Sequence, residues 1–127
     1  MDEKKTPKIL FVEDEENLLL LYRKEFEKEN YEILTATSAE EGLKILNKNP
    51  DIDIVVLDIK MKGMSGLEAL AKIARSRKEV GLIIATAYSS FQGDFTSWLA
   101  DAYIVKSPDF ISELKREVKR IMEEKKK

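Results

Sequence analysis

Short apolar runs alternate with longer amphipathic segments along the whole chain. Five runs rich in branched and aromatic residues have the length of buried strands. They are residues 8–12, 31–36, 52–58, 81–87 and 102–106. Because these runs are continuous rather than alternating with polar residues, both faces of each strand are expected to be covered. The pattern therefore predicts a parallel β-sheet buried between two layers of helices.

A segment with helical character follows each apolar run. These segments are residues 13–30, 38–49, 66–76, 91–100 and a last one from Pro108 onward. In the first segment four residues are spaced to share one face, namely Leu18, Leu21, Tyr22 and Phe26. The fourth segment is short and poorly patterned. The alternation predicts five helices.

Two of the predicted helices carry recognisable start signals. Ser38 with Glu41 three residues later forms a capping box, and Ser107 offers an N-cap with Pro108 in the first helical position. In the last helix the expected buried stripe is Ile111, Leu114, Val118 and Ile121. The lysine-rich end is expected to be a solvated tail.

Five strands alternating with five helices predict a three-layer, doubly wound α/β fold, because crossovers between parallel strands are right-handed. The working hypothesis for the sheet is the strand order 2-1-3-4-5. A chain of 127 residues fits one domain, 1–127, with a core over about 7–123 and a charged tail at 124–127.

The composition narrows the chemistry. The chain has no cysteine and no histidine, which excludes disulfides, thiolate sites, Ser-His triads and imidazole bases. The net charge of −2 argues against a nucleic-acid or membrane surface, and no apolar stretch approaches the ~20 residues of a membrane span. We therefore expect a cytoplasmic protein whose carboxylates, lysines and hydroxyls carry any chemistry.

Reactive side chains stand at the ends of four predicted strands. Glu13 and Asp14 follow the first strand, Asp58 ends the third, Thr86 the fourth and Lys106 the fifth. In the order 2-1-3-4-5 these strands are neighbours, and ligands of such sheets bind at the carboxyl ends of the strands. Taken alone, Glu13 and Asp14 are also residues that a helix N-terminus favours. Their coincidence with the other strand ends predicts one polar site.

Three carboxylates at one edge repel each other, and a hard divalent cation such as Mg²⁺ would relieve that repulsion. With the charge neutralised, a carboxylate such as Asp58 can attack phosphorus, which forms an aspartyl phosphate. Lys106 and Thr86 would then contact the phosphoryl oxygens.

Four segments resemble, in order and at matching separations, the receiver domains of bacterial two-component response regulators. They are "ILFVEDEENL", "VVLDIKMKGMSGLE", "IIATAYS" and "DAYIVKS". The resemblance covers nearly the whole chain. It implies a flavodoxin-like receiver fold and phosphorylation of Asp58 with Mg²⁺, the protein being no enzyme beyond its own phosphoryl transfer and dephosphorylation.

The resemblance also assigns individual roles. Asp14 is implied as the main Mg²⁺ ligand, Glu13 as a ligand directly or through water, and the backbone carbonyl of Lys60 as a further ligand. Thr86 and Lys106 take the phosphoryl-contacting places. Tyr103 takes the place of an aromatic side chain that swings inward on activation.

The family's partners are implied as well. A sensor histidine kinase, a phosphotransfer protein or a small phosphodonor would supply the phosphoryl group. The surface of the fourth helix, fifth strand and fifth helix would contact a downstream protein, and the domain would be a monomer or a weak phosphorylation-dependent dimer. No direct nucleic-acid or membrane partner is expected.

Two departures from the family and two other functions stay open. Lys62 stands where the family usually has proline, and Ser107 separates Lys106 from Pro108, so that a cis bond before the proline is not implied. One alternative is a pseudo-receiver that binds a partner without being phosphorylated. The other is a haloacid-dehalogenase-like phosphatase, which normally has a second Asp at the position of Lys60.

Overall fold

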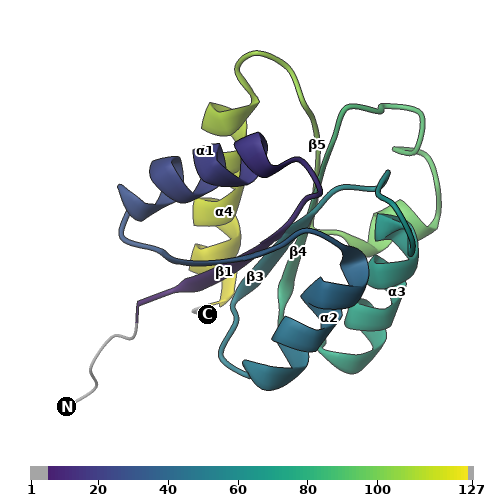
Figure 1. Cartoon of the computed structure of the whole chain (residues 1–127), viewed down its shortest axis with the longest axis horizontal. Coiled ribbons are helices and arrows are strands. Elements are labelled where there is room, and N and C mark those ends of the chain that lie inside the picture. Colours follow the sequence, from purple (N-terminus) through teal and green to yellow (C-terminus); the bar gives the residue numbers. More distant parts are fainter. Residues whose placement is uncertain (1–5, 126–127) are drawn as a thin grey trace.

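The computed structural model describes residues 6–125 and shows a five-stranded parallel sheet between helices (Figure 1). The strand order is β2-β1-β3-β4-β5, which confirms the predicted order. The strands are β1 (Lys8–Val12), β2 (Glu32–Ala36), β3 (Ile54–Leu57), β4 (Gly81–Thr86) and β5 (Ala102–Val105). Every predicted strand is present, within one or two residues of its predicted ends.

Helices cover both faces of the sheet. They are α1 (Glu16–Glu27), α2 (Ala39–Lys48), α3 (Gly66–Ser76) and α4 (Phe110–Lys125). Helices α1 and α4 lie on one face, whereas α2 and α3 lie on the other (Figure 1). None of these helices has the length and apolar character needed to cross a bilayer.

Alternate residues of each strand belong to two separate hydrophobic cores, one on each face of the sheet. In β1, Ile9 and Phe11 pack beneath α1 and α4, while Leu10 and Val12 pack beneath α2 and α3. Successive side chains of a strand point to opposite faces, so a strand covered on both sides must be apolar throughout. This requirement explains why the continuous apolar runs located the strands well.

The prediction of a helix over residues 91–100 is wrong. Residues 91–100 form turns followed by one short 3₁₀ helix, η1 (Thr96–Leu99). The Asp94 side chain accepts a hydrogen bond from the Thr96 backbone N–H at 2.8 Å, a local bond that competes with helix formation. Phe95 and Trp98 are 79% and 65% exposed, whereas Phe91 and Ala100 pack against the core, so the aromatic residues do not share one buried face.

Two further helix details differ from the prediction. Helix α4 begins at Phe110 rather than Pro108, because residues 108 and 109 form a turn in which the Phe110 N–H donates to the Ser107 carbonyl at 3.2 Å. The Ser107–Pro108 bond is trans, like every other described peptide bond. On α1 the buried face contains Leu19 with Tyr22 and Phe26, whereas Leu21 is exposed.

The remaining helix predictions fare better. The Ser38 hydroxyl accepts a hydrogen bond from the Glu41 N–H at 3.1 Å, while the Glu41 carboxylate accepts one from the Thr37 N–H at 2.7 Å. This arrangement confirms the capped start of α2. At the other end of the chain, Glu124 and Lys125 belong to α4 rather than to a tail, and residues 126–127 lie outside the described part.

Candidate functional site

Strand register places the predicted site residues side by side. Val12 is paired with Leu57, so that the next residues, Glu13 and Asp58, emerge together at the carboxyl edge of the sheet. The Asp58 N–H extends this pairing by donating to the Val12 carbonyl at 3.2 Å. At the neighbouring strands the Lys106 N–H donates to the Thr86 carbonyl at 2.7 Å. Backbone hydrogen bonds thus fix all four positions.

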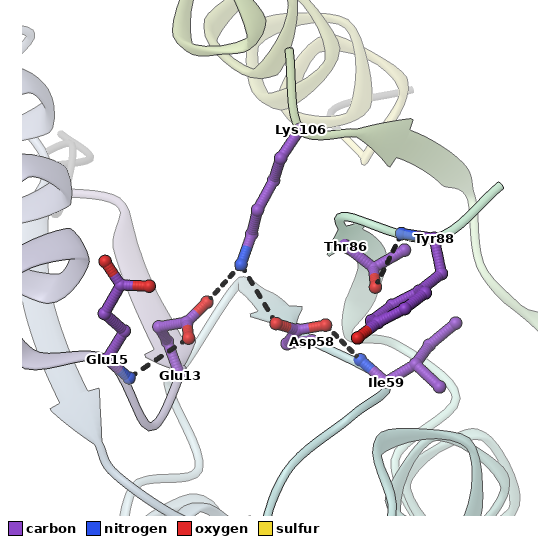
Figure 2. A network of polar contacts seen from close by, with 7 residues as sticks. All are labelled: Glu13, Glu15, Asp58, Ile59, Thr86, Tyr88 and Lys106. Atoms are coloured by element: carbon purple, nitrogen blue, oxygen red, sulfur yellow. Dashed lines mark hydrogen bonds and ion pairs between the residues drawn. The ribbon is translucent and has the colours of Figure 1, made fainter. Parts of the chain in front are cut away.

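The Lys106 ammonium joins the two carboxylates (Figure 2). Its Nζ lies 2.6 Å from Glu13 Oε1 and 2.9 Å from Asp58 Oδ2. The second oxygen of each carboxylate is bound by backbone, since Asp58 Oδ1 accepts from the Ile59 N–H at 2.7 Å and Glu13 Oε2 from the Glu15 N–H at 3.1 Å. Both carboxylates are therefore held in defined orientations.

Both carboxylates of this cluster are buried, so their negative charge needs a positive partner. Glu13 is 3% exposed and Asp58 is 8% exposed. Burial raises the pKa of Glu13, although its hydrogen bond with Lys106 acts in the opposite direction. Burial alone would lower the pKa of Lys106, but hydrogen bonds to Glu13 and Asp58 outweigh it and raise that pKa. One ammonium balances two carboxylates, which leaves the cluster with net negative charge.

Thr86 and Tyr103 connect this cluster to the next loop. Thr86 is fully buried, and its hydroxyl accepts a long 3.4 Å hydrogen bond from the Tyr88 N–H. The Tyr103 hydroxyl donates to the Tyr88 carbonyl. Both contacts end on the same residue, so β4, β5 and the loop after β4 meet beside Asp58.

Asp14 does not join the other carboxylates. Its side chain is exposed, and among residues 6–125 no group of three or more acidic side chains is arranged to hold a metal ion. The expectation that three carboxylates converge is therefore met by Glu13 and Asp58 only. Glu13 and Asp58 retain the oxygen donors that a hard cation prefers.

The ammonium of Lys60 lies over two aromatic rings. Its Nζ lies 5.6 Å from the centre of the Tyr88 ring and 5.5 Å from that of Phe91, distances typical of cation–π contacts. The two rings meet edge to face. Sequence reasoning had no signal for Phe91, because this contact depends on the path of the loop after β4.

Residues 9–119 match the family model described as the response regulator receiver domain. The chain is a response regulator receiver domain. The match spans the Glu13, Asp58, Thr86 and Lys106 positions that the geometry brings together. This assignment confirms the family and the fold that the sequence motifs predicted.

Solved structures and a curated relative agree with this family. The receiver domain is 44% identical to TrrA from Thermotoga maritima, whose crystal structure in complex with Mg²⁺-BeF covers 91% of this chain and 99% of that one with a TM-score of 0.87. TrrA in complex with histidine kinase ThkA superposes with a TM-score of 0.84, again at 44% identity and covering 91% and 98% of the two chains.

The curated relative is the transcriptional regulatory protein YvrH from Bacillus subtilis, 39% identical over 101 residues. The alignment covers 77% of this chain and 42% of YvrH, so the chain spans less than half the length of that relative.

Proposed function

We propose that this receiver domain accepts a phosphoryl group on Asp58 and thereby switches a protein-interaction surface. The observation that carries the proposal is the position of Lys106, which contacts both Asp58 and Glu13 at the carboxyl edge of the sheet beside the buried Thr86. A carboxylate next to a fixed ammonium and a hydroxyl suits the transfer of a dianionic phosphoryl group.

In the transfer step an Asp58 carboxylate oxygen attacks the phosphorus of the donor and forms a new P–O bond. The bond from phosphorus to the donor breaks, and the leaving group, a kinase histidine or acetate, keeps the electron pair. Lys106 offsets negative charge on the phosphoryl oxygens, and the Thr86 hydroxyl donates a hydrogen bond to one of them. The product is an aspartyl phosphate.

The residues fit a magnesium ion through their chemistry. Glu13 and Asp58 are buried carboxylates that already require positive charge, and the exposed Asp14 adds a third carboxylate next in sequence. Together with the Lys60 carbonyl, these oxygens would supply the hard donor set of a Mg²⁺ site once Asp14 turns toward the other two carboxylates. The bound ion would supply charge neutralisation for the approach of an anionic donor to Asp58.

The contacts of Tyr103 support a route from Asp58 to the surface. A phosphoryl group that draws the Thr86 hydroxyl toward itself displaces the acceptor of the Tyr88 N–H, and Tyr88 is also the partner of Tyr103. This change would shift the population of two packings at the surface formed by η1, β5 and α4. We propose that a downstream protein binds this surface and that a sensor histidine kinase supplies the phosphoryl group.

The test is intact mass after incubation with acetyl phosphate and Mg²⁺. We expect one added phosphoryl group on the wild type and none with EDTA or on Asp58→Asn, which removes the nucleophile at nearly constant volume. An adduct that persists on Asp58→Asn would refute the assignment of Asp58. No adduct on the wild type, with Mg²⁺ shown to bind, would instead support a binding module that is not phosphorylated.

A further inference from the structure

The loop between β3 and α3 carries Asp58 and is tightly held where its two ends meet. The Gly66 N–H donates to the Ile59 carbonyl at 2.9 Å. A side chain on Gly66 would place its Cβ 1.8 Å from the Asp58 carbonyl oxygen, so the start of α3 lies directly against the phosphoacceptor backbone. The position of α3 and the position of Asp58 are therefore coupled.

The middle of the same loop is held from outside by Glu40. The Met64 N–H donates to Glu40 Oε2 at 3.0 Å across 24 positions of sequence. Gly63 adopts φ +80, and a Cβ there would lie 2.9 Å from the same carboxylate oxygen. The loop thus approaches Glu40 through a backbone N–H and a glycine that leaves room for the carboxylate.

Glu40 is itself well anchored. It lies in the first turn of α2, directly after the Ser38 cap and the buried Ala39. The hydrogen bonds that its carboxylate accepts from its own N–H and from the Met64 N–H lower its pKa, so it is charged near neutral pH. A charged acceptor makes a stronger hydrogen bond than a neutral one.

Helix α2 is also fixed relative to the other acidic strand end. A Cβ on Gly42 would lie 2.8 Å from a methyl group of Val12, which shows how closely the helix packs on the end of β1. Val12 immediately precedes Glu13. Helix α2 thus contacts both the loop after Asp58, through Glu40, and the end of the strand that precedes Glu13, through Gly42.

We propose that Glu40 is a positioning residue for phosphoryl transfer, a clamp that holds the β3–α3 loop in the arrangement needed at Asp58 and at the Lys60 carbonyl. The inference rests on the proposed function, since it concerns the rate of that reaction.

The test compares the phosphorylation rates of four variants with acetyl phosphate as donor, over a series of Mg²⁺ concentrations. Glu40→Ala removes the acceptor and should lower the rate at limiting Mg²⁺ by about three- to tenfold, in line with the loss of one charge-assisted hydrogen bond. Glu40→Gln keeps an acceptor oxygen without the charge and should fall between Glu40→Ala and wild type. Gly63→Ala pushes on the same carboxylate and also strains a backbone at φ +80, so it should lower the rate at least as much as Glu40→Ala.

Glu68→Ala is the matched control. Glu68 also lies in the first turn of a helix, and its side chain makes no hydrogen bond or ion pair within residues 6–125. Its rate should stay within twofold of wild type. All rates are measured at a temperature at which circular dichroism shows every variant to be folded, so that reduced stability alone does not change them.

Amide hydrogen exchange at Met64, without any phosphodonor, tests the contact independently of the chemistry. Exchange should quicken in Glu40→Ala and stay unchanged in Glu68→Ala. Unchanged exchange in Glu40→Ala, or quicker exchange with a rate still within twofold of wild type, would overturn the inference. A wild type that takes up no phosphoryl group would overturn the proposed function itself, whereas a reactive wild type with an equally reactive Glu40→Ala would overturn only the clamp.

Discussion

Replacing Lys106 with Met tests how strongly the carboxylate pair depends on one ammonium. Methionine keeps much of the apolar stem and removes the charge that lies 2.6 Å from Glu13 and 2.9 Å from Asp58. Removing one partner of a buried ion pair costs about 3–5 kcal/mol. Two features reduce the cost here: the Lys106 side chain is 16% exposed, and the raised pKa of Glu13 makes it easier for this carboxyl to take up a proton. We therefore expect a loss of about 2–4 kcal/mol of unfolding free energy at neutral pH.

A double-mutant cycle separates this electrostatic cost from lost packing. Asp58→Asn alone removes one negative charge from a cluster that has two carboxylates and one ammonium, and it should change the unfolding free energy by about 1 kcal/mol or less. In Lys106→Met combined with Asp58→Asn, only Glu13 is left charged. The double variant should be more stable than the sum of the single effects predicts, by about 1 kcal/mol or more.

Urea unfolding followed by circular dichroism gives these values, provided that the slope of unfolding free energy against urea stays the same among the variants. Glu68→Gln serves as a control for removal of a surface charge. If Lys106→Met loses about 0.5 kcal/mol or less, or if the two substitutions are additive, Lys106 is not neutralising the buried carboxylates and the account of the site is wrong.

Three further predictions follow from single contacts. Gly66→Ala should lower the unfolding free energy by about 2–4 kcal/mol, because the added Cβ would meet the Asp58 carbonyl at 1.8 Å; an unchanged thermal midpoint would contradict this. Ser97→Ala should raise thermal stability by about 1 kcal/mol, because the buried Ser97 hydroxyl has no hydrogen-bond partner within the described chain; a lower midpoint would show that one exists. Because the pKa of Lys106 is raised above 10.5 in the folded protein, its contribution to stability is complete below pH 10.5 and is lost as the pH rises further. In urea titrations the difference in unfolding free energy between wild type and Lys106→Met should therefore shrink above pH 10.5. A constant difference would argue against the raised pKa.

The sheet and the strand-end site were predictable because each depends on a simple local pattern. A parallel strand covered on both faces must be apolar along its length, as in "IVVL" of β3, and a charged residue at its end is visible as a break in that pattern. Parallel strands all end at the same edge, so the strand order alone brings Glu13, Asp58 and Lys106 together. No side-chain detail was needed for that step.

Predictions failed where local signals were weak or were shared by several structures. Residues 91–100 contain Gly93 and Asp94, which favour turns, and these signals outweigh the helical spacing of Phe91, Phe95 and Trp98. On α1, Leu18 to Leu21 are all leucine, so apolar spacing alone could not decide which of them face the sheet, and Leu19 rather than Leu21 is buried. For Asp14, position in the sequence did not determine side-chain direction.

The contacts that tune the site are of a different kind from those that form it. Glu40 reaches Met64, and Lys60 reaches Phe91, through loops whose paths follow from tertiary packing rather than from a local pattern. Neither Glu40 nor Phe91 stands at a strand end, so a search for reactive residues there cannot find them. Phe91 contacts Lys60 and Glu40 contacts Met64, which follow Asp58 by two and six positions. Small shifts of such segments change the reaction geometry at Asp58. A receiver domain can therefore keep the same strand-end residues while its loop contacts set how fast Asp58 reacts, and the Glu40 variants measure that separation directly.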